Sequence, residues 1–450
     1  MLLLTNMKAV LHIGGKLMAN TKKKDTYCVA SDTGYGYLKA FINDEFVYVP
    51  TTWTELTDPS TYPNRISWDD LSEKGKKNYL DDIFNHQYVS FDDESMPRLT
   101  YKYLLGNMAY NKSDATNTIS YDPNNGKAKQ QNSYSFILSA IAYKRLQDEF
   151  AEKGEDLDLT KPLAANVELM VTALPISESK SDEDINNYRN KFLNGVHTVT
   201  IWNFKEGHVQ VNIKFKNVMV THEGLIARAV LRNSLQFAPN LIKNADKQLE
   251  RDYGKDKYDA EELFESENVL LIDVGSGTTD VVKIVDDHPL RDSKSIGDGY
   301  DSVLDRTVTA LQDQGYNAFR NAHELDKYLH DEHKSKQQKM VEKDILNTVA
   351  KQTNTLTSEI KNQFRKMMKG TVQTKIDAII VFGGGSVALN EITTIKEDLQ
   401  EEAKNMGLYL PSEQRYLGIP VVWIGEDDPT EASNLNSLGL ELMTKRLLSK

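Results

Sequence analysis

Two stretches far apart in the sequence follow one pattern, and this repeat constrains the fold more than any other feature. Each has an apolar run that ends in Asp, a turn of glycines and small residues, and a second apolar run. They are Tyr27–Gly36 followed by Tyr37–Ile42, and Leu270–Asp280 followed by Val281–Val285. The pattern predicts a β-hairpin whose glycines allow close backbone approach and whose N–H groups form an anion nest. Two facing hairpins of this kind predict a nucleotide gripped between two related lobes.

The aspartates at the strand ends are the predicted metal ligands of these hairpins. A carboxylate cannot hold phosphate directly, but Mg²⁺ prefers oxygen ligands and keeps several waters. Asp32 and Asp273 therefore predict a magnesium site, although Asp is also common in turns. Lys39 can neutralise phosphate charge, or its side chain can simply end at the surface. Thr278 and Thr279 also have a simpler interpretation, because Thr is an ordinary strand residue. The predicted phosphate-binding residues are Gly34, Tyr35, Gly36 and Lys39 in the first stretch and Gly275, Ser276, Gly277, Thr278 and Thr279 in the second.

A third glycine-rich stretch follows the apolar run Ile376–Phe382. Gly383, Gly384 and Gly385 allow an adenine ring or a ribose to approach closely, and Ser386 can cap the helix that follows. The same glycines also suit a tight strand-to-helix turn without a ligand. Gly297 and Asp298 are expected near the ribose or at the edge of an inserted segment.

The composition limits the partners and the compartment. The 450 residues carry 54 basic and 66 acidic side chains, a formal net charge of -12, so direct DNA binding is not expected. The single cysteine, Cys28, cannot form an internal disulfide, which indicates a reducing cytoplasm. No apolar run approaches the ~20 residues of a membrane span. His330 and His333 are expected on a solvated helix face rather than at a metal.

The order of strands and helices predicts an α/β protein of two related lobes, each with an inserted subdomain. A charged helical region that is nearly free of Gly and Pro marks the second insertion, and polar, aromatic-rich sequence marks the first. The expected parts are a tail at 1–24; a first core at 25–50, 101–265 and 426–450; its insertion at 51–100; a second core at 266–300 and 371–425; and its helical insertion at 301–370.

Together these motifs resemble the actin-like ATPases, and among them the plasmid-segregation actins of the ParM type. The resemblance covers nearly all of Tyr27 to Leu448. It departs from the family at Tyr35, where relatives carry Ser or Thr, and at His222, where they usually carry Pro. The segments that carry it are Asp32-x-Gly34-x-x-x-x-Lys39, Val171–Ser177, Asp273-x-Gly275-x-Gly277-Thr278-Thr279-Asp280, Phe382–Gly385 and Glu431–Gly439.

The resemblance implies an actin-like duplicated ATPase core with a nucleotide cleft between its lobes. It implies ATP and Mg²⁺ as cofactors, with Glu223 orienting the hydrolytic water and Asp273 as a second catalytic residue. Glu223 could instead serve only to complement a helix dipole. The implied partners are further copies of the chain, in a filament, and a DNA-binding adaptor that links it to plasmid DNA. A membrane-associated actin of the MreB or FtsA type and a small-molecule kinase are the alternatives.

Overall fold

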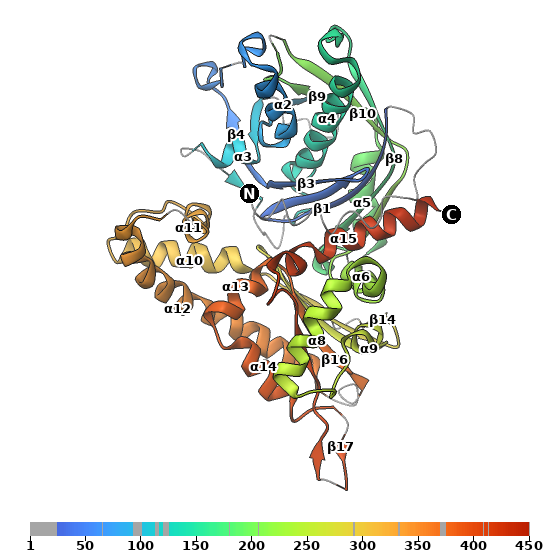
Figure 1. Ribbon diagram of the computed structural model, residues 1–450, viewed down its shortest axis with the longest axis vertical. Helices are drawn as coiled ribbons and strands as arrows, with labels where there is room; N and C mark the ends of the chain where they lie inside the picture. Colours follow the sequence, from blue (N-terminus) through green and yellow to red (C-terminus); the bar gives the residue numbers. More distant parts are fainter. Residues whose placement is uncertain are drawn as a thin grey trace. The chain divides into compact units, whose positions relative to one another are not determined.

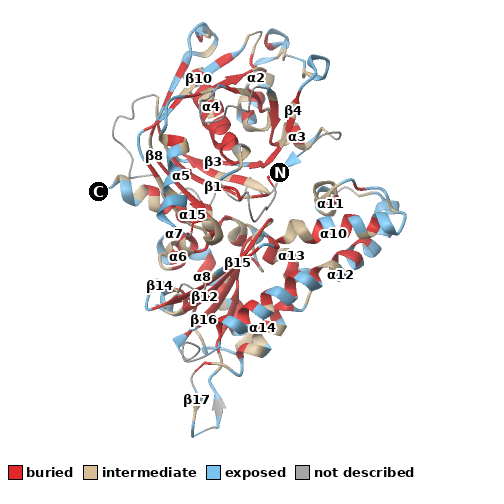
Figure 2. Ribbon diagram, turned by 180° about the vertical axis from the view of Figure 1, so that it is seen from behind, coloured by how far each residue is buried: buried red, intermediate tan, exposed pale blue. Residues whose placement is uncertain are grey.

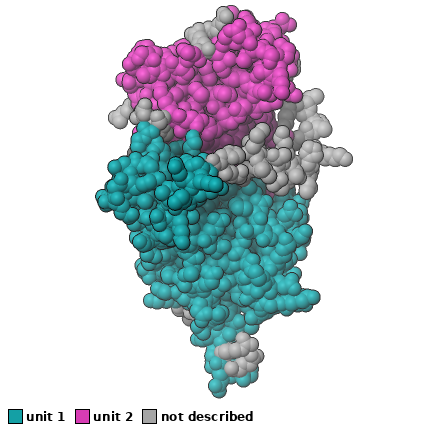
Figure 3. Space-filling model, turned by 60° about the vertical axis from the view of Figure 1, so that its left-hand side comes forward, with its two compact units in different colours: residues 1–14, 175–177, 223–438 teal, residues 15–174, 178–222, 439–450 magenta. Residues whose placement is uncertain are grey.

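The computed structural model describes residues 25–449 except 65, 93–100, 113–116, 120–125, 180, 206, 291–292, 332–333, 370–374, 408 and 413. The expected tail at 1–24 and His333 lie outside the described residues. The chain forms two compact units (Figure 3). Unit 1 includes Pro175–Ser177 and Glu223–Leu438, and unit 2 includes the described part of Gly15–Leu174 with Glu178–His222 and Gly439–Lys450. Each unit is described by itself.

Unit 2 is built on an 11-stranded sheet (Figure 1). The strand order is β3-β2-β1-β8-β10-β9-β5-β6-β4-β7, and β11 pairs with β8. The first three strands form an antiparallel meander, and β1 then runs parallel to β8. The strands are β1 (Thr26–Thr33), β2 (Tyr37–Ile42), β3 (Glu45–Pro50), β4 (Thr52–Leu56), β5 (Tyr88–Asp92), β6 (Lys102–Leu105), β7 (Asn117–Thr118), β8 (Leu163–Leu174), β9 (His197–Ile201), β10 (Val209–Phe215) and β11 (Val218–His222).

The segment predicted as an irregular insertion at 51–100 contributes strands to this same sheet. β5 pairs with β9, and β4 pairs with β6, so the insertion extends the sheet. Its short helix α2 (Glu73–Asp81) brings Tyr79 onto the buried ring of Trp68, with ring centroids 5.9 Å apart. Hydrophobic periodicity alone could not predict these strand pairings, because it does not identify partners that are distant in the sequence. β4 pairs with β6 across the segment that contains β5, and β5 pairs with β9.

Two long helices cover unit 2's sheet and anchor its core. α4 (Gln131–Lys153) buries Phe136, Ile137 and Ala140 and ends at Gly154, whose φ of 56° suits glycine. α5 (Asp182–Leu193) is capped by Ser181, whose side chain accepts a hydrogen bond from the N–H of Asp184. The last part of α15 (Pro429–Leu448) also belongs to this unit.

In the described part of the chain, unit 1 contains a six-stranded sheet whose central strands are buried (Figure 2). Every residue of β12, β13 and β16 is buried, as expected for strands with helices on both sides. The order is β14-β13-β12-β16-β19, with β15 paired to β13. The strands are β12 (Val269–Val274), β13 (Thr279–Val285), β14 (His288–Pro289), β15 (Lys294–Ile296), β16 (Ala378–Phe382) and β19 (Val421–Trp423).

Alternate residues of β12 pack against different helices. Leu270 and Ile272 share a core with α10 (Tyr300–Asp313), α12 (Lys336–Met367), α13 (Gly384–Ile392) and α14 (Ile395–Ala403). Val269 and Leu271 share another with α6 (Leu225–Leu231), α8 (Pro239–Tyr253) and α9 (Ala260–Glu265). The side-chain alternation of a strand therefore fills both helix layers.

The unit boundary differs from the boundary that the sequence suggested near 265/266. Residues 223–265 pack on unit 1's sheet through α6, α8 and α9, and only the end of α15 belongs to unit 2. The apolar faces of these helices indicate that they are buried, but not which of two similar sheets they cover. Unit 1 also carries α7 (Ser234–Phe237), α11 (Ala322–Leu329) and an unpredicted hairpin of β17 (Tyr409–Leu410) and β18 (Arg415–Tyr416). Among the described helices, none is long and apolar enough for a membrane crossing.

Candidate nucleotide-binding site

The two predicted hairpins have the same turn geometry, each within its own unit. The N–H of Gly34 donates to Tyr37 O over 2.9 Å, and the N–H of Gly275 donates to Thr278 O over 2.9 Å. Asp32 and Asp273 hold matching positions at the ends of β1 and β12, and each is 8% exposed. The internal repeat is therefore present down to individual hydrogen bonds.

The first turn is fastened to unit 2 by Thr51. The Thr51 N–H donates to Gly36 O over 2.9 Å, and its Oγ1 donates to Tyr35 O over 2.5 Å. These two bonds hold the carbonyls of the turn on one side. Lys39 lies directly opposite Asp32 in the β1–β2 ladder, so both can act at the same end of the hairpin.

The side chain of Tyr35 turns into unit 2. It is 5% exposed, and its hydroxyl donates to Glu178 Oε1 over 2.8 Å. The other oxygen of Glu178 accepts the N–H of Ala128 over 2.8 Å, and the Lys127 ammonium lies 6.0 Å from the Tyr35 ring centroid. The Tyr35 side chain thus anchors the turn to the interior of unit 2. Its predicted contribution to phosphate binding is therefore limited to its backbone.

In unit 1, Asp273 is fixed by the closing helix. Asn436 of α15 donates from Nδ2 to Asp273 Oδ2 over 2.8 Å, while Asn436 Oδ1 is buried without a partner in the structure. Sequence reasoning assigned no role to Asn436, although it lies within the recognised closing-helix segment. The signal that could have found it is its place in that segment, three residues before Gly439.

The second turn is interlocked with the starts of α10 and α13. The N–H groups of Tyr300 and Asp301 donate to Gly275 O and Ser276 O, over 3.1 and 2.9 Å. A Cβ on Gly299 would overlap Ser276 O, so this position must be glycine for the helix to begin there. These two N–H groups at the start of α10 therefore bind the turn carbonyls.

The predicted adenosine glycines are also in close contact with this turn. A Cβ on Gly383 would overlap Asp273 Oδ1, and one on Gly385 would lie 2.9 Å from Tyr300 Cβ and 3.0 Å from Gly275 O. Gly384 is different, because a Cβ there would meet only Ser433 Cβ at 3.8 Å. Ser386 is fully buried and donates to Gly383 O over 2.8 Å.

Asp298 is held beside the second hairpin with one oxygen uncommitted. Its Oδ1 accepts from Arg306 Nη1 over 3.0 Å, and its backbone carbonyl accepts from Thr279 Oγ1 over 3.0 Å. Its Oδ2 is buried and has no hydrogen-bond partner among the residues that the structure describes. A buried carboxylate oxygen without a donor is costly, and a ribose hydroxyl is a donor that would satisfy it. Gly297 precedes it, and Thr278 is buried in the turn.

Glu223 lies between β11 and α6, on the side of unit 1. Gly224 follows it with φ 75°, and a Cβ there would lie 3.1 Å from Val282 Cγ2 on β13. The junction is therefore pressed onto the second strand of the unit 1 hairpin. His222, on unit 2's side of the boundary, faces Ser179 Oγ at 2.7 Å from its Nδ1, and burial lowers its pKa.

The donor set suits Mg²⁺ better than a transition metal. Among the described residues, no group of three or more His, Cys, Asp or Glu side chains is arranged to hold a metal. Asp32 and Asp273 instead offer single carboxylates, which matches an ion that binds through one or two carboxylates and retains waters. The unpaired Oδ1 of Asn436 could accept a hydrogen bond from such a water.

A carboxylate beside the second turn titrates in an unusual range. Desolvation, with the nearby charges of Asp326 and Asp305, raises the pKa of Asp301 to about 7, while a hydrogen bond from Ser276 opposes the rise. The folded protein therefore binds a proton at Asp301 that the unfolded chain has released, between about pH 4 and pH 7.

We expect this proton to make the free energy of unfolding fall as the pH rises from about 4 to 7. Replacing Asp301 with Asn removes the charge and should flatten that part of the profile, with the variant more stable than wild type above pH 7. Denaturant unfolding across a pH series measures both profiles. Identical slopes in the two proteins would contradict the assignment.

A second prediction concerns the anchor of the first turn. Tyr35→Phe leaves Glu178 Oε1 without its donor and should lower the free energy of unfolding by roughly 1–3 kcal/mol. Tyr101→Phe is the matched control, because Tyr101 is 46% exposed. Urea unfolding of the three proteins decides it, and equal losses in both variants would show that the Glu178 bond is not the cause.

Comparison with known proteins supports the actin-like fold. Residues 30–225 match a family model described as actin like proteins N terminal domain, and residues 271–394 match one described as archaeal actin homologue MreB-like, C-terminal. No curated protein sequence matches the chain significantly.

Solved structures give the same result at low identity. The chain is similar to actin-like protein Alp7A (18% identity, 94% of this chain, 97% of that chain, TM-score 0.62). It is also similar to a non-polymerisable quadruple mutant of pCBH ParM (18%, 94%, 99%, 0.54) and to Bacillus thuringiensis ParM with ATP (14%, 95%, 100%, 0.52). The predicted actin-like α/β fold is confirmed, and ParM proteins are among those the chain resembles.

Proposed function

We propose that this chain, an actin-like protein by its fold, is an ATPase that polymerises with itself in the cytoplasm and moves plasmid DNA through a DNA-binding adaptor. The observation that best supports the proposal is the pair of matching turns, each beside an aspartate that is about nine-tenths buried. A backbone anion nest beside a carboxylate suits phosphate with Mg²⁺, and the presence of one such pair in each unit suits a magnesium nucleotide.

In this proposal the chain's own residues do most of the work by positioning. The turn backbones at Gly34–Gly36 and Gly275–Gly277 bind phosphate oxygens, and Asp32 and Asp273 hold Mg²⁺. When bound, the ion neutralises charge on the phosphates. Asp298 accepts a ribose hydroxyl at its free oxygen, and Gly384 leaves room for the base. Glu223 accepts a hydrogen bond from the attacking water and fixes its direction.

The test of this function is sedimentation with nucleotide. Purified protein is incubated with Mg²⁺ and ATP, a slowly hydrolysed ATP analogue, ADP or no nucleotide, then pelleted and inspected by electron microscopy. We expect filaments with ATP and its analogue and loss of the pellet as ATP is consumed. No pellet with either triphosphate over a wide protein concentration range would reject the proposal.

The role of Glu223 predicts a separation of assembly from hydrolysis. The Glu223→Ala variant should still pellet with ATP. Its rate of phosphate release should fall by up to about 10²-fold, because a group that orients the attacking water contributes on that order. Glu397→Ala, an exposed glutamate on α14, is the control. Wild-type phosphate release by the Glu223 variant would move this role to another residue.

The Asn436–Asp273 bond predicts a magnesium-specific defect. Asn436→Leu keeps the side-chain size but removes the donor, and loss of such a supporting group typically costs about 10–100-fold in metal affinity. We expect ATP to bind about tenfold more weakly in Mg²⁺, with no change in EDTA. Equal affinity changes in both buffers would indicate a general disturbance of the site.

A further inference from the structure

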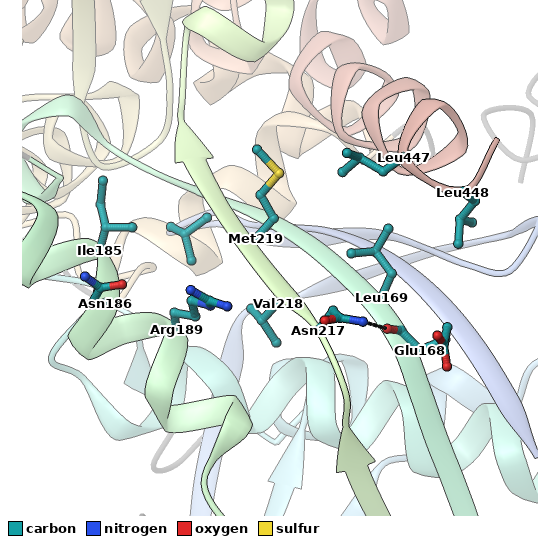
Figure 4. Close-up of a pocket in the computed structure, with 11 residues that line it drawn as sticks. Glu168, Leu169, Ile185, Asn186, Arg189, Asn217, Val218, Met219, Leu447 and Leu448 are labelled. Carbon is teal, nitrogen blue, oxygen red and sulfur yellow. Dashed lines mark hydrogen bonds between the residues drawn. The ribbon is translucent and has the colours of Figure 1, made fainter. Parts of the chain in front are cut away.

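An apolar groove lies in unit 2, and none of the predicted nucleotide-binding residues lines it. Its volume is about 520 Å³, and it is lined by α5, β8, β11 and the end of α15. Figure 4 shows Ile185 and Arg189 of α5 on one side and Leu447 and Leu448 of α15 on the other, with Met219 and Leu169 between them. In the described sheet, β11 pairs only with β8, so the groove follows a sheet edge.

The charges at this groove leave one cation uncompensated. Glu168 is neutralised by Lys216, whose Nζ lies 2.5 Å from Glu168 Oε1. Arg189 is exposed and takes part in no ion pair among the residues that the structure describes. In a chain of net charge -12, a lone arginine beside an apolar groove favours an apolar ligand that carries one carboxylate.

The same chain displays a surface with this complementary chemistry on unit 1. Near the start of α12, Met340 is 79% exposed and Val341 is 36% exposed. Asp344 follows Met340 by four residues, so it lies on the same helix face. It is exposed, and it forms no ion pair within the described part of the chain.

We infer that α12 of one copy docks in the α5–α15 groove of the next copy, with Met340 and Val341 in the apolar floor and Asp344 paired with Arg189. The two surfaces differ, so the contact is heterologous, and a heterologous contact that does not close generates an open filament. The inference rests on the proposed function, because it names the contact that would join the subunits.

A charge-swap cycle tests the pairing. Arg189→Glu and Asp344→Arg each place like charges in contact, and each should raise the critical concentration for ATP-dependent assembly about three- to tenfold. The double variant restores opposite charges and should assemble nearly as wild type does. Glu359→Arg is the control, since it reverses an exposed acid about four turns further along α12.

Cross-linking between separate copies provides a second readout. In a Cys28→Ala background, protein carrying Met340→Cys is mixed with protein carrying Leu447→Cys, and a short bis-maleimide is added with ATP. We expect a mixed cross-linked dimer under assembly conditions and none with Tyr101→Cys in place of Leu447→Cys.

The outcomes separate this contact from the proposed function. If wild type assembles and the single charge variants assemble equally well, or if the double variant is no better than the singles, the α12–groove contact is overturned while the filament function stands. A cross-link within one copy, seen when both cysteines share a chain but not in the mixture, also overturns it. If wild type never assembles with ATP, the function itself fails.

Discussion

The turn after β12 depends on contacts too close to admit a side chain. Gly299, Gly383 and Gly385 each bring a neighbouring segment against it, and in two of these positions a Cβ would overlap a turn oxygen or Asp273 itself. Such contacts fix the orientation of the turn carbonyls and hold Asp273 at the end of its strand. There its Oδ2 accepts a hydrogen bond from Asn436. If this turn binds the predicted nucleotide, a turn already held by such contacts loses less entropy on binding.

The two hairpins reach similar geometry by different means. In unit 1 glycines and helix starts enclose the turn, whereas in unit 2 Thr51 and the Tyr35–Glu178 bond hold it from beneath. At Tyr35 the hydroxyl is directed to Glu178 and is not available to a phosphate. The hydrogen bond that it forms there holds the turn in place. A departure from a family pattern can thus preserve the backbone nest while moving the supporting contact to another element.

The sequence predicted well those features that depend on local chemistry. Both hairpins and the strand before Gly383 follow from apolar runs bounded by turn residues, and the structure has them within a few positions. It could not predict that β5 pairs with β9, or that α6, α8 and α9 cover unit 1's sheet, because these depend on distant partners. Thr51, Glu178, Arg306 and Asn436 were missed for the same reason: each acts through a contact across more than seven residues.

The proposed subunit contact would also allow an acidic chain to associate with copies of itself. A net charge of -12 opposes association between identical molecules, and that repulsion must be offset locally. In this contact one ion pair, between Asp344 and Arg189, neutralises two otherwise exposed charges. Burial of the apolar groove adds a hydrophobic contribution that does not depend on charge screening by salt. Assembly would then weaken only moderately as salt rises, whereas a purely ionic contact would be lost. Salt dependence of the critical concentration therefore distinguishes an apolar contact with one ion pair from a charge-dominated one.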